Sequence, residues 1–175
     1  LCSDLLIGVT SFFRDEAAFK SLGEHVLAPL LRKKKSVRIW SIACSTGEEA
    51  YSIAILLCEY MERLNYNADV KIFASDTDPD AIAVAQRGFY TEGSLASIDE
   101  HMIEKYFDKK EEGYIIKDMI RKMIVFARHN IFRDAPFSKL DLIVCRNMFI
   151  YVKPEVQKRT IGNFHHLLND DGCLF

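Results

Sequence analysis

The sequence predicts an α/β fold in which a mostly parallel sheet is flanked by helices. Short β-rich runs alternate with helical segments along most of the 175 residues, a pattern typical of parallel sheets covered on both faces. The run Leu140 to Cys145 is apolar enough to be buried on both sides, as parallel strands are. Acidic, hydroxyl or amide residues directly follow several predicted strands, at the edge where open α/β sheets bind ligands.

Local patterns place these elements along the chain. Tyr51, Ile55 and Cys58 recur at helical spacing and predict the first long helix. Asp78 is suited to cap the next helix, with Pro79 at its first position. The predicted strands span 37–43, 70–74, 124–127 and 140–145, with a fifth beginning at 173, and the predicted helices span 48–64, 79–87 and 153–168.

Two segments depart from this alternation. Residues 1–35 form a lead-in to the first strand that is predicted to be helical over 1–31, with Ser11 or Asp15 as its cap. Residues 89–123 are too long for a plain connection between a helix and a strand. We therefore expect an inserted, small antiparallel β-subdomain there, with a helix over 98–107 and a strand over 113–117.

Composition limits the class of protein. A chain of 175 residues is expected to form one domain, over 1–175. The 23 Lys and Arg residues against 25 Asp and Glu residues give a net charge of −2, which does not favour nucleic-acid binding. No apolar stretch reaches the ~20 residues that a membrane helix needs, so no membrane insertion is predicted. The five cysteines form no Cys-x-x-Cys pair, which favours a reduced, cytoplasmic compartment.

The turn after the first predicted strand is suited to a ligand. Ser45, Thr46 and Gly47 allow backbone N–H groups to approach a bound group, and the helix that follows favours negative charge. The turn is neither G-x-G-x-x-G nor a Walker loop, because it has one Gly and no Lys after it. Glu48 and Glu49 have a second explanation, since acids at a helix start also stabilise the helix dipole.

Polar residues after three other strands extend this candidate site. Asp76 ends the second strand, where an acid accepts hydrogen bonds from ribose hydroxyls or simply forms a turn. Asn130 and Ile131 follow the third strand and are suited to border an adenine. Asn147 leaves the buried fourth strand, where packing does not explain an amide. An acid without a phosphate loop favours a nucleoside that lacks a pyrophosphate, and S-adenosylmethionine fits this better than NAD or ATP.

Other reactive groups form no site in the sequence. His165 and His166 have no Cys or Asp at metal-ligand spacing, so no metal site is predicted. No nucleophile motif such as G-x-S-x-G occurs. The basic run over 32–35 predicts a solvated loop.

In this order and with these gaps, the residues resemble the S-adenosylmethionine-binding domain of the CheR family, the chemotaxis receptor methyltransferases. The most specific segments are C-S-T-G-E-E-A-Y-S-I-A over 44–54 and C-R-N-M-F-I-Y over 145–151. The resemblance covers nearly the whole chain and implies a Rossmann-like methyltransferase fold. The segment I-G-V-T-S-F-F-R-D over 7–15 looks like the CheR modules of multidomain signalling proteins, in which CheR is joined to CheB or other modules.

The resemblance implies S-adenosylmethionine-dependent methylation of glutamate side chains on chemoreceptor cytoplasmic domains, with S-adenosylhomocysteine as the product. It makes Arg14 and Tyr151 the catalytic candidates, with Tyr151 facing the substrate channel. The cofactor-binding residues that it implies are Thr10, Arg14, Ala43, Glu49 (or its neighbour Glu48), Asp76, Asn130, Ile131, Asn147 and Met148.

This chemistry needs no general base, which agrees with the lack of a catalytic His or Cys motif. A glutamate carboxylate is ionised at neutral pH, because its unperturbed pKa is about 4.3. Alignment of the carboxylate with the sulfonium methyl can contribute up to roughly 7–11 kcal/mol. Arg14 and Tyr151 are therefore predicted to act by positioning the carboxylate or the cofactor.

Three departures from the family pattern leave alternatives open. Gly8 stands where the family usually has Asn, the family's N-terminal helical domain is absent from the sequence, and the strand pair that closes the sheet would follow Phe175. A cofactor-binding module with weak catalysis and a small-molecule methyltransferase on the same fold are the alternatives. The insertion at 89–123 resembles the β-subdomain that docks a receptor tail peptide in some members.

Overall fold

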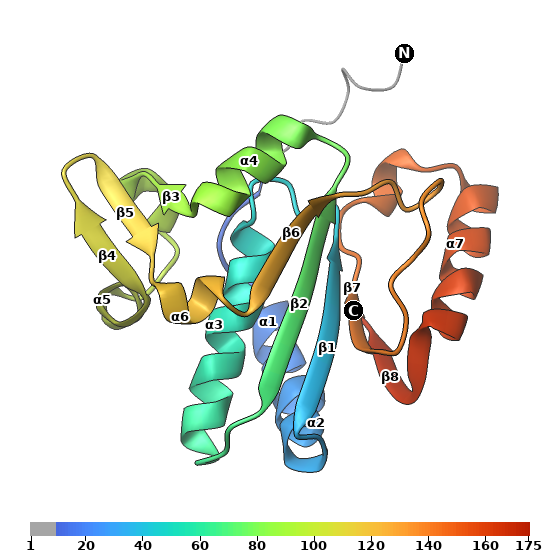
Figure 1. The fold of residues 1–175 in the computed structure, drawn as a ribbon, viewed down its shortest axis with the longest axis horizontal. Coiled ribbons are helices and arrows are strands. Elements are labelled where there is room, and N and C mark those ends of the chain that lie inside the picture. The colour runs from blue at the N-terminus through green and yellow to red at the C-terminus, as the bar shows by residue number, and fades with distance from the viewer. Residues whose placement is uncertain (1–9) are drawn as a thin grey trace.

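The computed structural model describes residues 10–175 and contains a five-stranded sheet whose pairs are all parallel. The strand order is β6-β2-β1-β7-β8 (Figure 1). The chain builds outward from β1 through β2 to β6, then crosses to the other side of β1. The carboxyl ends of β1 and β7 therefore form the switch point at which open α/β sheets bind ligands. The strands span Ser36–Ile42 (β1), Asp69–Asp76 (β2), Ile124–Arg128 (β6), Leu140–Val144 (β7) and Leu168–Leu174 (β8).

Helices cover both faces of this sheet, which confirms the predicted α/β fold. Alternate residues of β1 point to opposite faces. Val37 and Ile39 join the larger core with the helices before β1 and with α3, whereas Trp40 and Ile42 pack with Phe164 of α7. In Figure 1 these two sets of helices lie on opposite sides of the sheet. The helices are α1 (Glu16–Leu22), the π-helix η1 (Gly23–Leu27), α2 (Ala28–Lys33), α3 (Glu48–Arg63), α4 (Pro79–Arg87) and α7 (Pro154–Leu167).

The lead-in is less helical than the sequence predicts. Residues 10–15 form turns, and α1 begins at Glu16 with Asp15 as its cap. Phe13 and Asp15 have left-handed φ angles of 48° and 68°, which a helix does not allow. Phe12 is fully buried, with its ring edge-on to Tyr90 at 4.9 Å. This segment is therefore held in an irregular path across the core, and Asp15 is confirmed as one of the two predicted caps.

The predicted antiparallel insertion is confirmed as a separate three-stranded sheet with the order β3-β5-β4. The expected helix and strand are both found, as α5 and β5, whereas the strand β4 was not predicted. Tyr106 Oη donates to Glu59 of α3 at 2.6 Å, which ties the insertion to the main sheet's helices. Its elements are β3 (Phe89–Tyr90), the 3-10 helix η2 (Glu92–Leu95), α5 (Glu100–Tyr106), β4 (Phe107–Lys110), β5 (Gly113–Ile116) and α6 (Asp118–Arg121).

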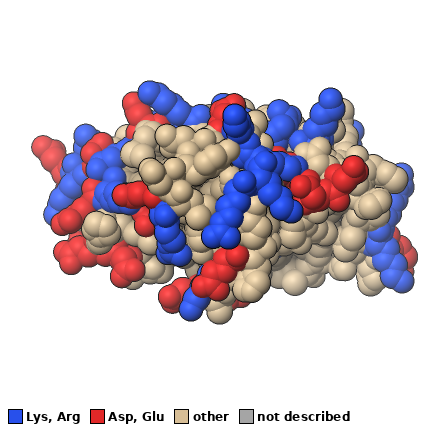
Figure 2. Space-filling model, turned by 90° about the horizontal axis from the view of Figure 1, so that it is seen from below, with Lys and Arg blue, Asp and Glu red and all other residues tan. Residues whose placement is uncertain are grey.

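The basic run over 32–35 is only partly the solvated loop that its composition suggests, because three of its residues are exposed but the first two belong to α2. Arg32 and Lys33 end α2, and Lys34 Nζ lies 2.7 Å from Asp141 and 2.6 Å from Asp171. Figure 2, which views the end of the molecule where β1 and β2 begin, shows Lys and Arg side chains interspersed with acidic ones. One of the positive charges in this run, that of Lys34, therefore stabilises the fold through ion pairs. No helix among residues 10–175 is both long and apolar enough to cross a membrane.

Candidate functional site

Asp76 joins the carboxyl ends of three neighbouring strands. Its Oδ2 accepts a hydrogen bond from the backbone N–H of Ser45 at 2.8 Å, in the turn after β1. Its backbone carbonyl accepts from the N–H of His129 at 2.9 Å, just after β6. Asp76 Oδ1 accepts from the N–H of Asp78 at 3.0 Å. Both interpretations of Asp76 therefore stay open, because it shapes the turn and leaves acceptor capacity for a ligand.

The turn between β1 and α3 has an unusual backbone. Ala43 and Ser45 have φ angles of 56° and 49°, and Gly47 has a φ of 98°. A Cβ at Gly47 would lie 2.9 Å from Ala85 Cβ, so glycine is required there for space as well as conformation. Left-handed backbone of this kind is strained in other residues and collects at functional sites. The turn thus brings its N–H groups close to the edge of the sheet.

Left-handed conformations also occur on the other segments that reach this edge. Asn147, after β7, has a φ of 57°. With Phe13, Asp15, Ala43 and Ser45 it makes five of the seven non-glycine positive φ angles among residues 10–175. Because strain of this sort costs of order 1–3 kcal/mol each, its concentration here favours a functional explanation over chance.

Glu48 and Glu49 differ in their surroundings, although both open α3. Glu48 is buried, and both its carboxylate oxygens lie within 2.9 Å of Thr46 Oγ1. Burial raises the pKa of Glu48, and the Thr46 hydrogen bond opposes this rise. Glu49 Oε1 accepts from Ser41 Oγ at 3.2 Å, and Glu49 Oε2 lies 3.6 Å from Arg146 Nη1. Burial raises the pKa of Glu49 to about 7, against the lowering effect of Arg146.

Arg146 is a residue of this cluster that sequence reasoning did not assign. Its guanidinium lies beside the rings of Phe19 and Phe175, which pack edge to face against each other, at 5.3 Å and 5.2 Å from their centroids. It also lies 3.7 Å from Asp15 and 3.6 Å from Glu49. Its Nη1 is buried and has no hydrogen-bond partner. In the sequence, only its position next to Asn147, after the buried strand, indicated that Arg146 could belong to the site.

The predicted adenine side follows β6 in a loop over 129–139 that contains no helix. Asn130 Oδ1 accepts from the N–H of Phe132 at 2.9 Å, so this amide partly serves its own turn. Ile131 packs with Met148 against the core around Trp40. The structure thus brings residues after β6 and β7 to one apolar patch beside the strand ends.

The remaining predicted residues lie on exposed or half-buried segments. Thr10 is half-buried and Arg14 is exposed, and the charge of Arg14 helps to lower the pKa of Glu49. Tyr151 lies in the 3-10 helix η3 (Phe149–Tyr151) and is 57% exposed. Gly8 lies outside the described residues. The assigned functions of these residues stay predictions.

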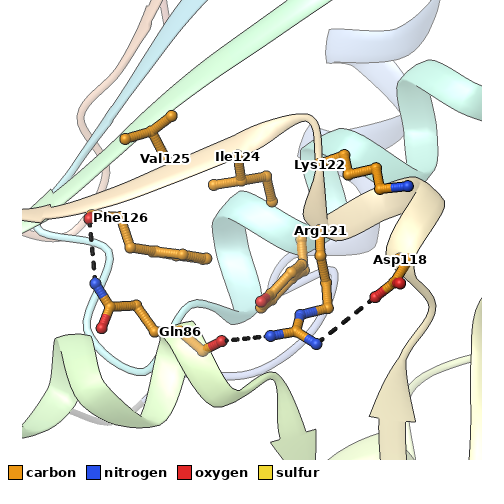
Figure 3. A pocket seen from close by; sticks show the side chains of 8 residues that line it. Gln86, Asp118, Arg121, Lys122, Ile124, Val125 and Phe126 are labelled. Atoms are coloured by element: carbon orange, nitrogen blue, oxygen red, sulfur yellow. Dashed lines mark hydrogen bonds and ion pairs between the residues drawn. The ribbon is translucent and has the colours of Figure 1, made fainter.

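A cavity of about 450 Å³ lies elsewhere, beside the edge strand β6 (Figure 3). Arg121 donates to the carbonyl of Gln86 at 3.0 Å and lies 3.7 Å from Asp118. Arg121, Gln86 and Asp118 in the lining of this cavity are thus already engaged in contacts, and none of the predicted site residues lines it. The lining residues are Tyr51, Gln86, Asp118, Arg121, Lys122, Ile124, Val125 and Phe126. Among residues 10–175, no group of three His, Cys, Asp or Glu side chains could hold a metal.

Comparisons with known proteins identify the family of this chain. The family model "CheR methyltransferase, SAM binding domain" matches residues 8–175. The chain is 41% identical, over 98% of its length, to a 104.1 kDa protein of the hypE 3′ region of Rhodobacter capsulatus, of which it covers 18%. It is 34% identical to a chemotaxis protein methyltransferase of Borreliella burgdorferi, over 94% of this chain and 61% of that protein. The chain thus spans less than two thirds of either relative.

A solved structure shows the same fold at low sequence identity. The S-adenosylmethionine-dependent methyltransferase of Geobacter sulfurreducens, in complex with S-adenosyl-L-homocysteine, has a TM-score of 0.50 and 12% identity over 94% of this chain and 49% of that one. At this identity the likeness supports the fold alone. The match over residues 8–175 carries the assignment, and the chain belongs to the CheR methyltransferase family through its S-adenosylmethionine-binding domain.

Proposed function

We propose that this chain is the cofactor-binding domain of an enzyme that methylates glutamate side chains on chemoreceptor cytoplasmic domains, with S-adenosylmethionine as donor. The observation that carries the proposal is the cluster formed by Glu49, Asp76 and the Arg146–Asn147 pair at one edge of the sheet, in a chain of the CheR family. A substrate of this kind also places the protein in the cytoplasm.

The donor set fits S-adenosylmethionine. Asp76 at the end of β2 is where α/β nucleoside sites place the acid that holds ribose hydroxyls. Glu49 offers a carboxylate to an ammonium group, and the turn after β1 has no Lys for a phosphate. Arg146 Nη1 is a buried polar atom without a hydrogen-bond partner, and such atoms are uncommon outside binding and catalytic sites.

Each residue of the site contacts a different part of the cofactor or substrate. Asp76 holds the ribose, and Glu49 lies with Ala43 beside the amino acid part of the cofactor. Asn130 and Ile131 border the adenine. The segment with Thr10 and Arg14 lies over the cofactor, Asn147 and Met148 hold it near the transferred methyl group, and Tyr151 faces the incoming glutamate.

The reaction is an in-line displacement, in which a glutamate oxygen bonds to the methyl carbon while the bond from that carbon to sulfur breaks. When bound, S-adenosylmethionine supplies an electrophilic methyl group on a positively charged sulfur. No proton needs to be removed, because the attacking carboxylate is ionised at neutral pH. Arg14 and Tyr151 therefore act by orienting the two reactants, and the left-handed turns keep their supporting backbone fixed.

The inserted β-subdomain is proposed as a second contact for the receptor. Its strand order β3-β5-β4 leaves one side of β4 without a neighbouring strand in its sheet. Asp108, Lys109 and Lys110 on that strand are exposed. An extended receptor tail peptide is able to add a strand at such an edge through main-chain hydrogen bonds.

The test uses the full-length protein that carries this chain. Titration calorimetry should show binding of S-adenosylhomocysteine, and tritiated methyl groups should pass from S-adenosylmethionine to a receptor cytoplasmic fragment. The label should be released by mild base, as it is from esters. Binding without transfer to any carboxylate substrate would instead support a signalling module with weak catalysis, and transfer only to small molecules would support a different substrate class.

A further inference from the structure

We propose that Arg146 is a positioning residue that fixes the Glu49 carboxylate toward the ammonium group of the cofactor's amino acid part. The inference rests on the proposed function, because it takes Glu49 as a cofactor contact. It extends that function by naming what orients the contact.

Arg146 packs against two aromatic rings that meet at a corner. Phe19 of α1 and Phe175 at the end of the sheet lie 5.3 Å and 5.2 Å from the guanidinium carbon. A planar guanidinium packs broadly against aromatic rings, whereas the compact ammonium of a lysine covers less of them. The Arg146 side chain is only 14% exposed, so its direction is set by packing.

Glu49 is approached from two sides that face away from solvent. Ser41 Oγ, fully buried on β1, donates to Oε1 at 3.2 Å. Arg146 Nη1 lies 3.6 Å from Oε2 and has no hydrogen-bond partner. Each carboxylate oxygen accepts more than one hydrogen bond. The two neighbours therefore fix the plane of the carboxylate and leave it free to accept hydrogen bonds from a bound ammonium.

A cation next to Glu49 is needed to keep its buried carboxylate ionised. Burial raises the pKa of Glu49 to about 7, so the buried carboxylate would be largely protonated in mildly acid solution. Arg146, the Ser41 hydrogen bond and Arg14 lower that pKa, in this order. Asp15 Oδ2 lies 3.7 Å from Arg146 Nη2, so the Arg146 guanidinium pairs with Asp15 as well as with Glu49.

The other titratable groups around Glu49 do not replace this cation. Glu48 is turned to Thr46 and has a pKa raised by burial. The thiols of Cys44 and Cys145 have pKa values raised first by burial and further by the charge of Glu49, so they stay neutral. Arg146 is therefore the main positive charge that acts on Glu49.

The experiment measures binding of two probes to the full-length protein by calorimetry between pH 6 and pH 9. S-adenosylhomocysteine contains the amino acid part, and 5′-methylthioadenosine lacks it. With Arg146→Gln, affinity for S-adenosylhomocysteine at pH 7 should fall about ten- to hundredfold, as expected for a weakened charged hydrogen bond. Affinity for 5′-methylthioadenosine should stay within about twofold of wild type.

The pH profile separates positioning from a structural defect. Binding of S-adenosylhomocysteine should rise with pH as Glu49 ionises, and in Arg146→Gln this rise should move to higher pH. Arg146→Lys should restore part of the pH shift but less of the affinity. Arg63→Gln removes an exposed arginine at the far end of α3, the helix that carries Glu49 in its first turn. It should not change the affinity for either probe.

Several results would overturn the inference. Equal loss of both probes in Arg146→Gln, or an unchanged pH profile with wild-type affinity, would assign Arg146 to packing alone. If Arg146→Gln does not fold, Arg146→Lys is measured with the same two probes, and an unchanged affinity for S-adenosylhomocysteine contradicts the proposal. A wild-type protein that binds neither probe would instead refute the proposed function, and the inference with it.

Discussion

The backbone N–H of Ser45 donates a 2.8 Å hydrogen bond to Asp76 Oδ2, which ties the turn after β1 to the end of β2. The acid proposed to hold the ribose is thus also the acid that shapes the neighbouring turn. This hydrogen bond ties the turn that contains the left-handed residues Ala43, Ser45 and Gly47 to the end of β2 within the chain itself.

Replacement of Asp76 should separate these two functions. Asp76→Ala removes both the acceptor for Ser45 and the proposed ribose contact, so affinity for S-adenosylhomocysteine should fall by about a hundredfold or more. Asp76→Asn keeps one carbonyl oxygen for the turn and should retain more affinity. Asp80→Ala removes an exposed acid nearby and serves as the control. Calorimetry that finds Asp76→Ala unchanged would show that the pocket is wrongly placed.

The sequence predicted most of what depends on local pattern. Asp78 was predicted as a cap from its place before Pro79, and its Oδ1 accepts from the N–H of Asp80 at 2.8 Å. The buried strand at 140–145 is β7, and all five of its residues are buried. Period and capping act between residues a few positions apart, so one sequence is enough to recognise them.

What the sequence did not predict depends on contacts between distant residues. Arg146 is held by Phe19 and Phe175, and no local pattern joins these three. The irregular path of residues 10–15 follows from burial of Phe12 against the inserted subdomain, which overrides a helical composition. The strand β4 was not predicted, because three of its four residues, Asp108, Lys109 and Lys110, are charged and carry no β-strand pattern.

Gly47 should be required for stability. Gly47→Ala would place a Cβ 2.9 Å from Ala85 Cβ at a φ of 98°. The free energy of unfolding should fall by roughly 1–3 kcal/mol, as measured by urea denaturation. Gly93→Ala is the matched control, because a Cβ there meets nothing within 4 Å. Similar values for the two variants would contradict the strain that we assign to the turn.

Glu49 should make the fold less stable as the pH rises. Its pKa is raised from 4.5 to about 7 by burial, so the folded state binds the proton more tightly than the unfolded state. The stability this gives is present below about pH 4.5 and is lost as the pH passes through about 7. The free energy of unfolding of Glu49→Gln should therefore rise relative to that of the wild type between pH 5 and pH 8, by up to about 3 kcal/mol. Denaturant titrations at both pH values test this, and a constant difference would contradict it.

Asp141 should be the more important of the two carboxylates that bind Lys34. It is 3% exposed and accepts from Lys34 Nζ at 2.7 Å, the N–H of Arg38 at 2.8 Å and Asn169 Nδ2 at 2.6 Å. Asp141→Ala leaves the Arg38 N–H and Asn169 Nδ2 without this acceptor, whereas Lys34 keeps Asp171, and the free energy of unfolding should fall by roughly 1–3 kcal/mol. Asp171 is 49% exposed, so Asp171→Ala should lower the free energy of unfolding by much less than Asp141→Ala does. Denaturation of the two variants at equal pH tests this expectation. If Asp171→Ala lowers the free energy of unfolding as much as Asp141→Ala does, the extra hydrogen bonds of the buried Asp141 carboxylate add no stability.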